Sequence, residues 1–159
     1  MTAYLDNSAT TLVCSEAVEA MKTAVTELWG NPSSLHQKGI EADEMLENAR
    51  SNVARRLFCR DDEVYFTSGG TESNNLAVQG AAHAMRRRGR RIVTTSVEHP
   101  SIDETVKHLE NEGFEVIRLG VDKNGRISER ELFEAVTPDT ILVSIMAVNN
   151  ETGTIQPVE

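Results

Sequence analysis

The sequence predicts an α/β fold with a mostly parallel sheet covered by helices. From residue 60 onward, short β-branched and apolar runs alternate with amphipathic stretches, which is the order expected of βαβ units. One run, Thr140–Val148, is apolar almost throughout, as expected of a strand buried on both faces. Two helical patterns precede this part. We therefore expect an N-terminal helical segment (residues 1–59) and an α/β domain (residues 60–159).

The N-terminal segment carries two helical patterns separated by a loop. Apolar residues recur at helical spacing over Ser15–Leu28, with Ser15 as the expected N-cap. The stretch Gly30–Gly39 contains glycine, proline and serine and is predicted to be a loop. A second helix is expected over Ile40–Phe58.

The remaining elements follow from apolar runs bounded by capping residues and turn residues. Ser101 with Glu104, and Ser128 with Glu131, have the spacing of capping boxes, and Gly113 is placed to end a helix. In chain order we predict a strand at Glu63–Phe66, a helix at Glu72–Met85, a strand at Arg91–Val97, a helix at Ser101–Glu112, a strand at Phe114–Leu119, a turn at 123–125, a helix at Ser128–Val136 and a strand at Thr140–Val148.

Composition excludes several classes of partner. The 159 residues hold 16 basic and 25 acidic side chains, a formal net charge of −9, which disfavours nucleic acid and anionic membranes. The arginine-rich stretch Arg86–Arg91 is interpreted as a basic helix end. No signal peptide or long apolar run is present, so we expect a cytoplasmic protein that does not meet a membrane. Cysteines and histidines lack metal-ligand spacing, and no metal is expected.

The most informative stretch, Phe66–Ser73, follows a predicted strand and opens a predicted helix. Gly69 and Gly70 allow close approach of the backbone to a ligand, and the first helix amides have no intrahelical partner. Hydroxyls at Ser68, Thr71 and Ser73 add donors. These features predict a cradle for a compact monophosphate. The alternative is an ordinary strand–helix turn capped by Thr71.

Two further polar clusters follow predicted strands. His99 lies between a strand and a helix, and Asn149-Asn150-Glu151 follows the strand at Thr140–Val148. Each has a structural alternative, a histidine without a catalytic role in the first case and a simple turn in the second. In a parallel sheet, ligands bind beyond the carboxyl ends of the strands. Since all three clusters are expected there, we predict that they line one crevice.

The sequence resembles the cysteine desulfurases of the NifS/IscS-like group, which are pyridoxal 5′-phosphate (PLP) enzymes of aminotransferase class V. The similarity extends along the whole chain. The matching motifs occur in family order: YLDNSATT at Tyr4–Thr11, GNPSSLH at Gly30–His36, FTSGGTESNNLAV at Phe66–Val78, VEHPS at Val97–Ser101 and VNNETGTIQPV at Val148–Val158.

The resemblance implies roles for four residues. Gly70 and Thr71 would bind the PLP phosphate. His99 would stack on the pyridine ring and shuttle protons. Asn150 would contact the PLP 3′-oxygen and help to hold the substrate carboxylate. The fold implied is part of the large domain of a fold-type I PLP enzyme.

The reaction implied by the resemblance is that of a transferase that converts L-cysteine to L-alanine and leaves an enzyme-bound persulfide. That sulfur would pass to an acceptor such as an iron–sulfur scaffold protein, and the complete enzyme would be a homodimer. The family's Schiff-base lysine and sulfur-accepting cysteine have no counterpart among these residues, so we expect the chain alone to be a truncated, inactive part. Two alternatives stay open: another class V enzyme such as a selenocysteine lyase, or a non-catalytic dimerisation fragment.

Overall fold

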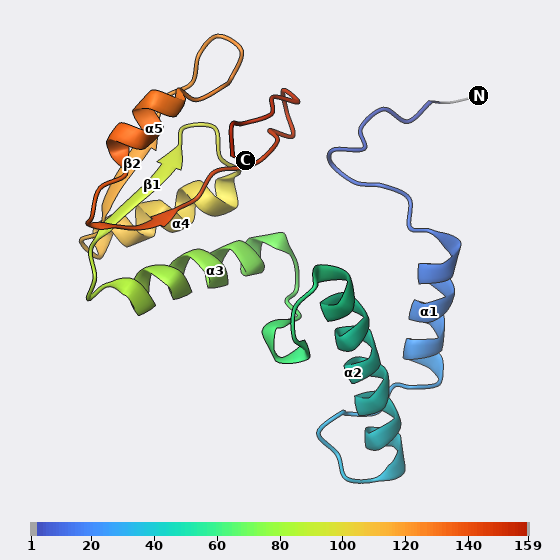
Figure 1. The fold of residues 1–159 in the computed structure, drawn as a ribbon. Helices are drawn as coiled ribbons and strands as arrows, with labels where there is room; N and C mark the ends of the chain where they lie inside the picture. The colour runs from blue at the N-terminus through green and yellow to red at the C-terminus, as the bar shows by residue number, and fades with distance from the viewer. Residues whose placement is uncertain (1–2, 159) are drawn as a thin grey trace. The chain divides into compact units, whose positions relative to one another are not determined.

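The computed structural model describes residues 3–158, which fall into two compact units (Figure 1). The first unit ends at Phe66 and the second begins at Thr67. The first contains two α-helices and one turn of 3₁₀ helix, and the second contains a sheet with three helices: α1 Ser15–Thr26, α2 Gln37–Leu57, η1 Asp61–Glu63, α3 Gly70–Met85, β1 Arg91–Thr95, α4 Pro100–Asn111, β2 Glu115–Leu119, α5 Glu129–Ala135 and β3 Thr140–Val143.

The two helices of the first unit are confirmed, with different starting residues. Cys14 occupies the N-cap position of α1, so Ser15 is the first helical residue and not the cap. Helix α2 begins three residues before the expected Ile40 because His36 caps it: its side chain accepts a hydrogen bond from the Gly39 amide at 3.3 Å. It ends where Phe58 adopts a left-handed conformation with φ 55°.

The prediction of a strand at Glu63–Phe66 is wrong. Glu63 ends η1, and residues 64–66 pair with no strand in the described part of the chain. An extended segment becomes a strand only when its backbone groups bond to a neighbour. Here the Val64 carbonyl oxygen instead accepts from the guanidinium of Arg50 on α2. Within this run, Val64 has extended backbone angles (φ −99°, ψ 122°), but the apolar pattern could not show that a partner strand is missing.

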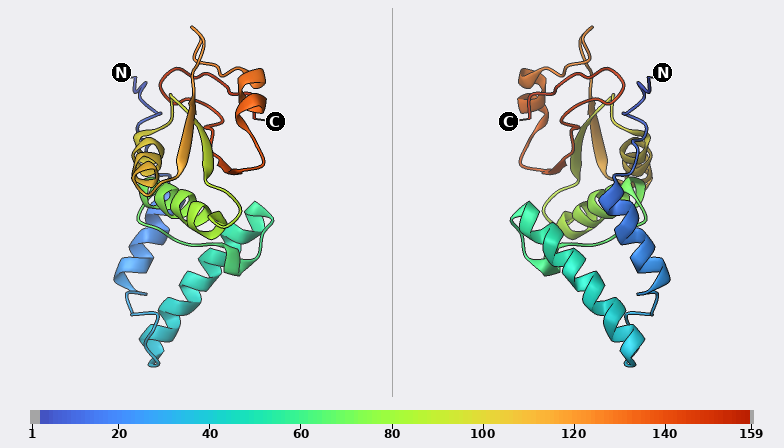
Figure 2. Two further views of the ribbon diagram at one scale, coloured as in Figure 1. Left: turned by 90° about the vertical axis from the view of Figure 1, so that its left-hand side faces the viewer. Right: turned by 90° about the vertical axis from the view of Figure 1, so that its right-hand side faces the viewer.

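The parallel sheet is confirmed. Its order is β2-β1-β3, and both neighbours of β1 run parallel to it. Figure 2 shows α4 in yellow and α5 in orange on opposite sides of the strands. Successive β1 residues serve the two faces, with Ile92 against α3 and α4 and Val93 against the layer that includes α5. The second unit is thus a three-layer helix–sheet–helix arrangement, with fully buried Ile92 and Val93 at its centre.

The strand expected at Thr140–Val148 is shorter than predicted. It ends at Val143, and none of its four residues is fully buried. Ser144 still donates to the Val93 carbonyl at 2.9 Å, but the next bonds along the chain go to side chains instead of the sheet. The apolar run beyond Val143 continues as irregular backbone past the end of β1.

Helix α4 uses a different cap from the one expected. It begins at Pro100, and its N-cap is His99, so the proposed pairing of Ser101 with Glu104 is wrong. The helix stop is confirmed, since Gly113 has φ 88°. At α5 the Ser128 side chain accepts from the Glu131 amide at 3.3 Å, which confirms Ser128 as that helix's cap.

No helix among residues 3–158 combines the length and apolar character needed to cross a bilayer.

Candidate functional site

The three polar clusters lie at one edge of the second unit. Because β1 and β3 run parallel, the segments that follow them leave the sheet on the same side, and α3 enters the unit there as well. Figure 1 shows the first turns of α3 and α4 and the red segment 144–158 at the end toward which β1 points. The edge expected to hold ligands is therefore the edge on which these residues converge.

The loop before α3 is held by its own side chains. Glu72 Oε2 accepts from the Ser68 amide at 2.7 Å and from the Ser68 hydroxyl at 2.6 Å. These two bonds, the hydroxyl's being the larger cause, lower the pKa of the Glu72 carboxyl. The Thr67 and Ser73 hydroxyls lie 2.7 Å apart. Of the three hydroxyls expected to face a ligand, those of Ser68 and Ser73 are thus engaged inside the loop.

The first turn of α3 is open to a ligand. A Cβ placed on Gly69 or Gly70 would meet no atom within 4 Å. Gly70 and Thr71 are exposed, and no hydrogen bond from the Thr71 hydroxyl is found within residues 3–158. The first backbone amides of a helix have no intrahelical acceptor and lie at the positive end of the helix dipole. Room, free amides and a free hydroxyl together suit a phosphate group.

The His99 ring is fixed on one side and free on the other. Its Nδ1 accepts from the Ser101 amide at 3.1 Å and lies 2.8 Å from the Ser101 hydroxyl, which accepts from Asn74 Nδ2 on α3 at 2.7 Å. Because Nδ1 is an acceptor, the neutral ring carries its proton on Nε2. The side chain is exposed, so Nε2 and the ring faces are available to a ligand.

Thr71 and His99 line one groove between α3 and α4, with a volume of about 570 Å³. Most of its lining residues are of polar type, but carbon atoms supply most of the surface that faces the groove. Thr71, Asn75 and Gln79 come from α3, and His99, Pro100, Ser101, Glu104, Thr105 and His108 come from α4 and its cap. Of the three residues expected to bind the phosphate and the ring, Thr71 and His99 are therefore brought together in this groove, whereas Gly70 is not among its lining residues.

Asn150 does not line that groove. Its side chain is exposed and donates to Glu151 Oε1 at 2.8 Å. The neighbouring Asn149 is 8% exposed, and its Nδ2 donates to the Val97 carbonyl at 3.1 Å, two residues before His99. The segment that carries Asn150 is thus connected directly to the loop that carries His99.

The sequence did not reveal the structural roles of Glu98 and Asn149, which form hydrogen bonds between distant segments. Glu98 was seen only as the neighbour of His99, whereas Asn149 was expected to line the crevice with Asn150 and is instead buried. Their one available signal is position, since each is a polar residue placed between the end of a strand and a candidate site residue. Their hydrogen bonds span 48 and 52 residues of sequence, and no local pattern reveals such pairings.

Two of the four lysines, Lys38 and Lys107, are held in ion pairs with acidic side chains of their own helices. Lys107 on α4 lies 2.7 Å from both Asp103 and Glu104, and the hydrogen bond to Asp103 is the main cause of its raised pKa. A raised pKa leaves less of the neutral amine that attacks a carbonyl. Lys38, expected in a loop, lies in α2, where it pairs with Glu41 at 2.8 Å.

No group of three or more histidine, cysteine, aspartate or glutamate side chains with metal-binding geometry occurs among residues 3–158.

The chain is similar to known proteins along nearly its whole length. The family model described as Aminotransferase class-V matches residues 3–159. A "Cysteine desulfurase IscS" of Methanosarcina thermophila is 50% identical over 98% of the chain. A "NifS/IcsS protein homolog" of Lactobacillus delbrueckii subsp. bulgaricus is 54% identical over the same share. The chain spans 39% and 40% of these two relatives, respectively.

Two solved structures are similar in fold. One is described as a "NIFS-LIKE PROTEIN", with a TM-score of 0.93, 46% identity and coverage of 99% of this chain and 43% of that one. Another, described as "SspA in complex with cysteine", has a TM-score of 0.89, 37% identity and coverage of 99% and 46%. The fold of the helix–sheet–helix unit therefore has counterparts in longer proteins.

Proposed function

Because the chain belongs to the aminotransferase class-V family, we propose that it supplies the phosphate- and ring-binding part of a PLP-dependent cysteine desulfurase. The observation that carries the proposal is the groove in which the open first turn of α3, at Thr71, meets the exposed ring of His99. Relatives named cysteine desulfurase over 98% of the chain, and the likeness to a structure with bound cysteine, support L-cysteine as the substrate.

The residues present fit the cofactor by their chemistry. A phosphate dianion is suited to the free amides of Gly70 and Thr71 and to the Thr71 hydroxyl. A flat aromatic ring is suited to an exposed imidazole. The carboxamide of Asn150 would donate to the 3′-oxygen of PLP and to the substrate carboxylate. When bound, PLP supplies an electron sink for a carbanion next to the amino group of the substrate.

His99 is oriented for its proposed part by α4. The cap bond from the Ser101 amide holds Nδ1, so the ring cannot turn freely about its Cβ. The proton of the neutral ring then sits on the exposed Nε2, where it can be donated to a substrate group and recovered. The cap bond occupies only Nδ1. The ring face therefore stays free to stack on the cofactor, and Nε2 stays free to transfer a proton.

The complete reaction needs groups that we do not find among the described residues. We propose that a lysine amine and a sulfur-accepting cysteine come from the part of the relatives that this chain does not span, and that the sulfur then passes to an acceptor such as an iron–sulfur scaffold protein. On this proposal the chain alone releases no sulfide from L-cysteine.

Binding of pyridoxine 5′-phosphate tests the phosphate cradle without interference from the lysines, because this analogue has no aldehyde. We expect Thr71→Val to weaken its binding about tenfold, the effect of losing one hydrogen bond to a charged group. Gly70→Val should weaken binding as well, since the added side chain would fill the open space above the helix. Calorimetric titration measures both effects.

Three controls sharpen this experiment. Thr71→Val should leave the weaker binding of pyridoxine, which lacks the phosphate, unchanged. Thr137→Val makes the same chemical change in the loop before β3 and should bind as the wild type does. His99→Asn keeps an N-capping side chain but removes the ring, and it should weaken binding of both ligands. Unchanged binding of pyridoxine 5′-phosphate to Thr71→Val would contradict the cradle.

A further inference from the structure

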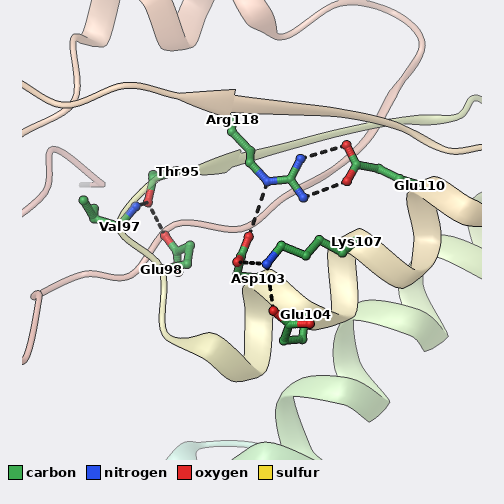
Figure 3. Close-up of polar contacts among 8 residues, drawn as sticks. All are labelled: Thr95, Val97, Glu98, Asp103, Glu104, Lys107, Glu110 and Arg118. Atoms are coloured by element: carbon green, nitrogen blue, oxygen red, sulfur yellow. Dashed lines mark hydrogen bonds and ion pairs between the residues drawn. The ribbon is translucent and has the colours of Figure 1, made fainter.

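Glu98 joins the segments that follow β1 and β3. Its Oε1 accepts from the Thr95 hydroxyl at 2.7 Å and from the Met146 amide at 3.0 Å. Figure 3 shows the first of these contacts, together with the Val97 amide, which donates to the Thr95 oxygen at 3.3 Å. One carboxylate oxygen therefore connects the end of β1 to the Met146 amide, which lies 48 residues after Glu98.

Asn149 makes the reciprocal connection. Its Nδ2 donates to the Val97 carbonyl, while its Oδ1 accepts from the amides of Glu151 and Thr152, each at 2.9 Å. The side chain is buried and thereby shapes the turn on which Asn150 lies. We call the bonds made by Glu98 and Asn149 across the two segments the strand-end latch.

The latch residues alternate with the proposed cofactor-binding residues. Glu98 precedes His99, and Asn149 precedes Asn150. In each pair the first side chain bonds to the other segment, and the second is exposed at the ligand-binding edge. The positions of His99 and Asn150 relative to each other therefore depend on bonds made by neighbours that need not touch the cofactor.

Resting on the proposed function, we propose that Glu98 is a positioning residue for the cofactor site. Its carboxylate holds the segment that carries Asn150 against the loop that carries His99, so that ring and carboxamide meet one ligand. A carboxylate suits this position because it accepts two hydrogen bonds on one oxygen without needing a donor of its own.

Substitution of Glu98 by glutamine and by alanine distinguishes two requirements: a hydrogen-bond acceptor that positions the segment, and a negative charge. The amide oxygen of Glu98→Gln can still accept from Thr95 and Met146, whereas Glu98→Ala removes the acceptor. We expect hydrogen-exchange protection of the Met146 amide to fall about tenfold in Glu98→Ala and to be largely retained in Glu98→Gln. Core amides such as Leu109 should keep their protection in both.

The effect of each substitution on ligand binding is measured by NMR, as the chemical-shift changes that pyridoxine 5′-phosphate induces at each residue. We call such a change the response of that residue. In Glu98→Ala the Gly70 and Thr71 amides should still respond, while the responses of the His99 ring and the Asn150 side-chain amide shrink. Glu98→Gln should restore them. General loss of structure would instead remove all four responses, so this split distinguishes positioning from stability. Glu134→Ala, which removes an exposed acidic side chain on α5, is the matched control.

The outcomes separate this inference from the proposed function. If wild-type protein shows no response at Gly70 and Thr71, the proposed cradle fails, while exchange at Met146 still tests the latch. If the wild type responds and Glu98→Ala responds identically at His99 and Asn150, the positioning part is overturned. Unprotected Met146 in the wild type would likewise overturn it.

Discussion

Single side chains in this protein serve structure and candidate chemistry at the same time. His99 caps α4 through Nδ1 and leaves Nε2 exposed in the groove that it shares with Thr71. Sequence alone singled out His99 from its place between a strand and a helix. It did not reveal the cap, because histidine is not among the preferred N-cap residues. The expected Ser101–Glu104 pairing was the conventional choice, and the imidazole took its place.

The ion pairs of Arg118 offer a test at the residue scale. Its guanidinium on β2 forms two hydrogen bonds to Glu110, at 2.7 and 2.8 Å, and one to Asp103 at 3.4 Å, as Figure 3 shows. Since these side chains are roughly one-third exposed, we expect Arg118→Met to lower the free energy of unfolding by about 1 kcal/mol at pH 7.

This loss should depend on pH. Hydrogen bonding to Arg118 lowers the pKa of the Glu110 carboxyl, and hydrogen bonding first to Lys107 and then to Arg118 lowers that of Asp103. A carboxyl with a lowered folded-state pKa stabilises the fold above its unfolded-state value, about 4, and loses that effect as pH falls through the folded value. The free energies of unfolding of Arg118→Met and of the wild type, measured with urea, should therefore differ less near pH 3 than at pH 7.

Arg130→Met is the matched control for Arg118→Met. Arg130 lies 2.8 Å from Glu134, but its side chain is 85% exposed, so its removal should change stability little at either pH. If the loss of unfolding free energy caused by Arg118→Met is as large near pH 3 as at pH 7, the loss does not come from the ion pairs of Arg118.

At the scale of elements, the sequence predicted which helices and strands exist, and in what order, better than it predicted where each one ends. Helices were recognised because their spacing is local, and the strands β1 and β2 because each is a short apolar run between clear turns. The strand expected at residues 63–66 failed since pairing is not a local property. The end of β3 was misjudged for a related reason: the Met146 amide, inside the apolar run, bonds to Glu98 instead of a strand.

Two glycines in different backbone conformations give opposite predictions. Gly113 ends α4 with φ 88°, a conformation that costs an alanine about 1 kcal/mol. Gly80 lies inside α3, where a Cβ would meet no atom within 4 Å and alanine favours the helix by a similar amount. We expect Gly113→Ala to lower and Gly80→Ala to raise the midpoint of thermal unfolding, measured by circular dichroism.

These two substitutions act as controls for each other, since each adds one methyl group. Stabilisation by Gly113→Ala would mean that the residue does not adopt a left-handed conformation in solution. Destabilisation by Gly80→Ala would mean that the outer face of α3 is covered in solution, because a methyl group costs stability in a helix only where it meets something.

At the scale of the whole molecule, one topological rule accounts for part of the candidate site: residues that follow parallel strands meet at one edge of the sheet. The rule applies to His99, which follows β1. The strand expected before Thr71 is absent, so Thr71 lies beside His99 because α3 packs against α4. Asn150 marks the limit of that rule. The rule fixes the edge of the sheet and not the path of a loop, so it could not tell that Asn149 turns inward while Asn150 is exposed outside the groove.

The first unit leaves apolar side chains uncovered within the described residues. Helix α1 buries none of its residues, and its apolar stripe Val18, Met21 and Val25 is exposed by 47%, 63% and 72%. Apolar patches of this kind on a folded chain mark contact surfaces or association-prone surfaces. We expect the chain to bind the dye anilinonaphthalene sulfonate and to self-associate at micromolar concentration.

Replacing Met21 and Val25 with lysine tests the stripe directly. Both side chains are exposed, so the free energy of unfolding should change by no more than about 0.5 kcal/mol for each. Dye fluorescence and the mass measured by light scattering should both fall, because the charges interrupt the apolar surface. Asn111→Lys adds the same charge at the exposed end of α4 and should leave both unchanged. If the lysine variants bind dye as strongly as the wild type, the dye reports another surface, and α1 is covered in solution.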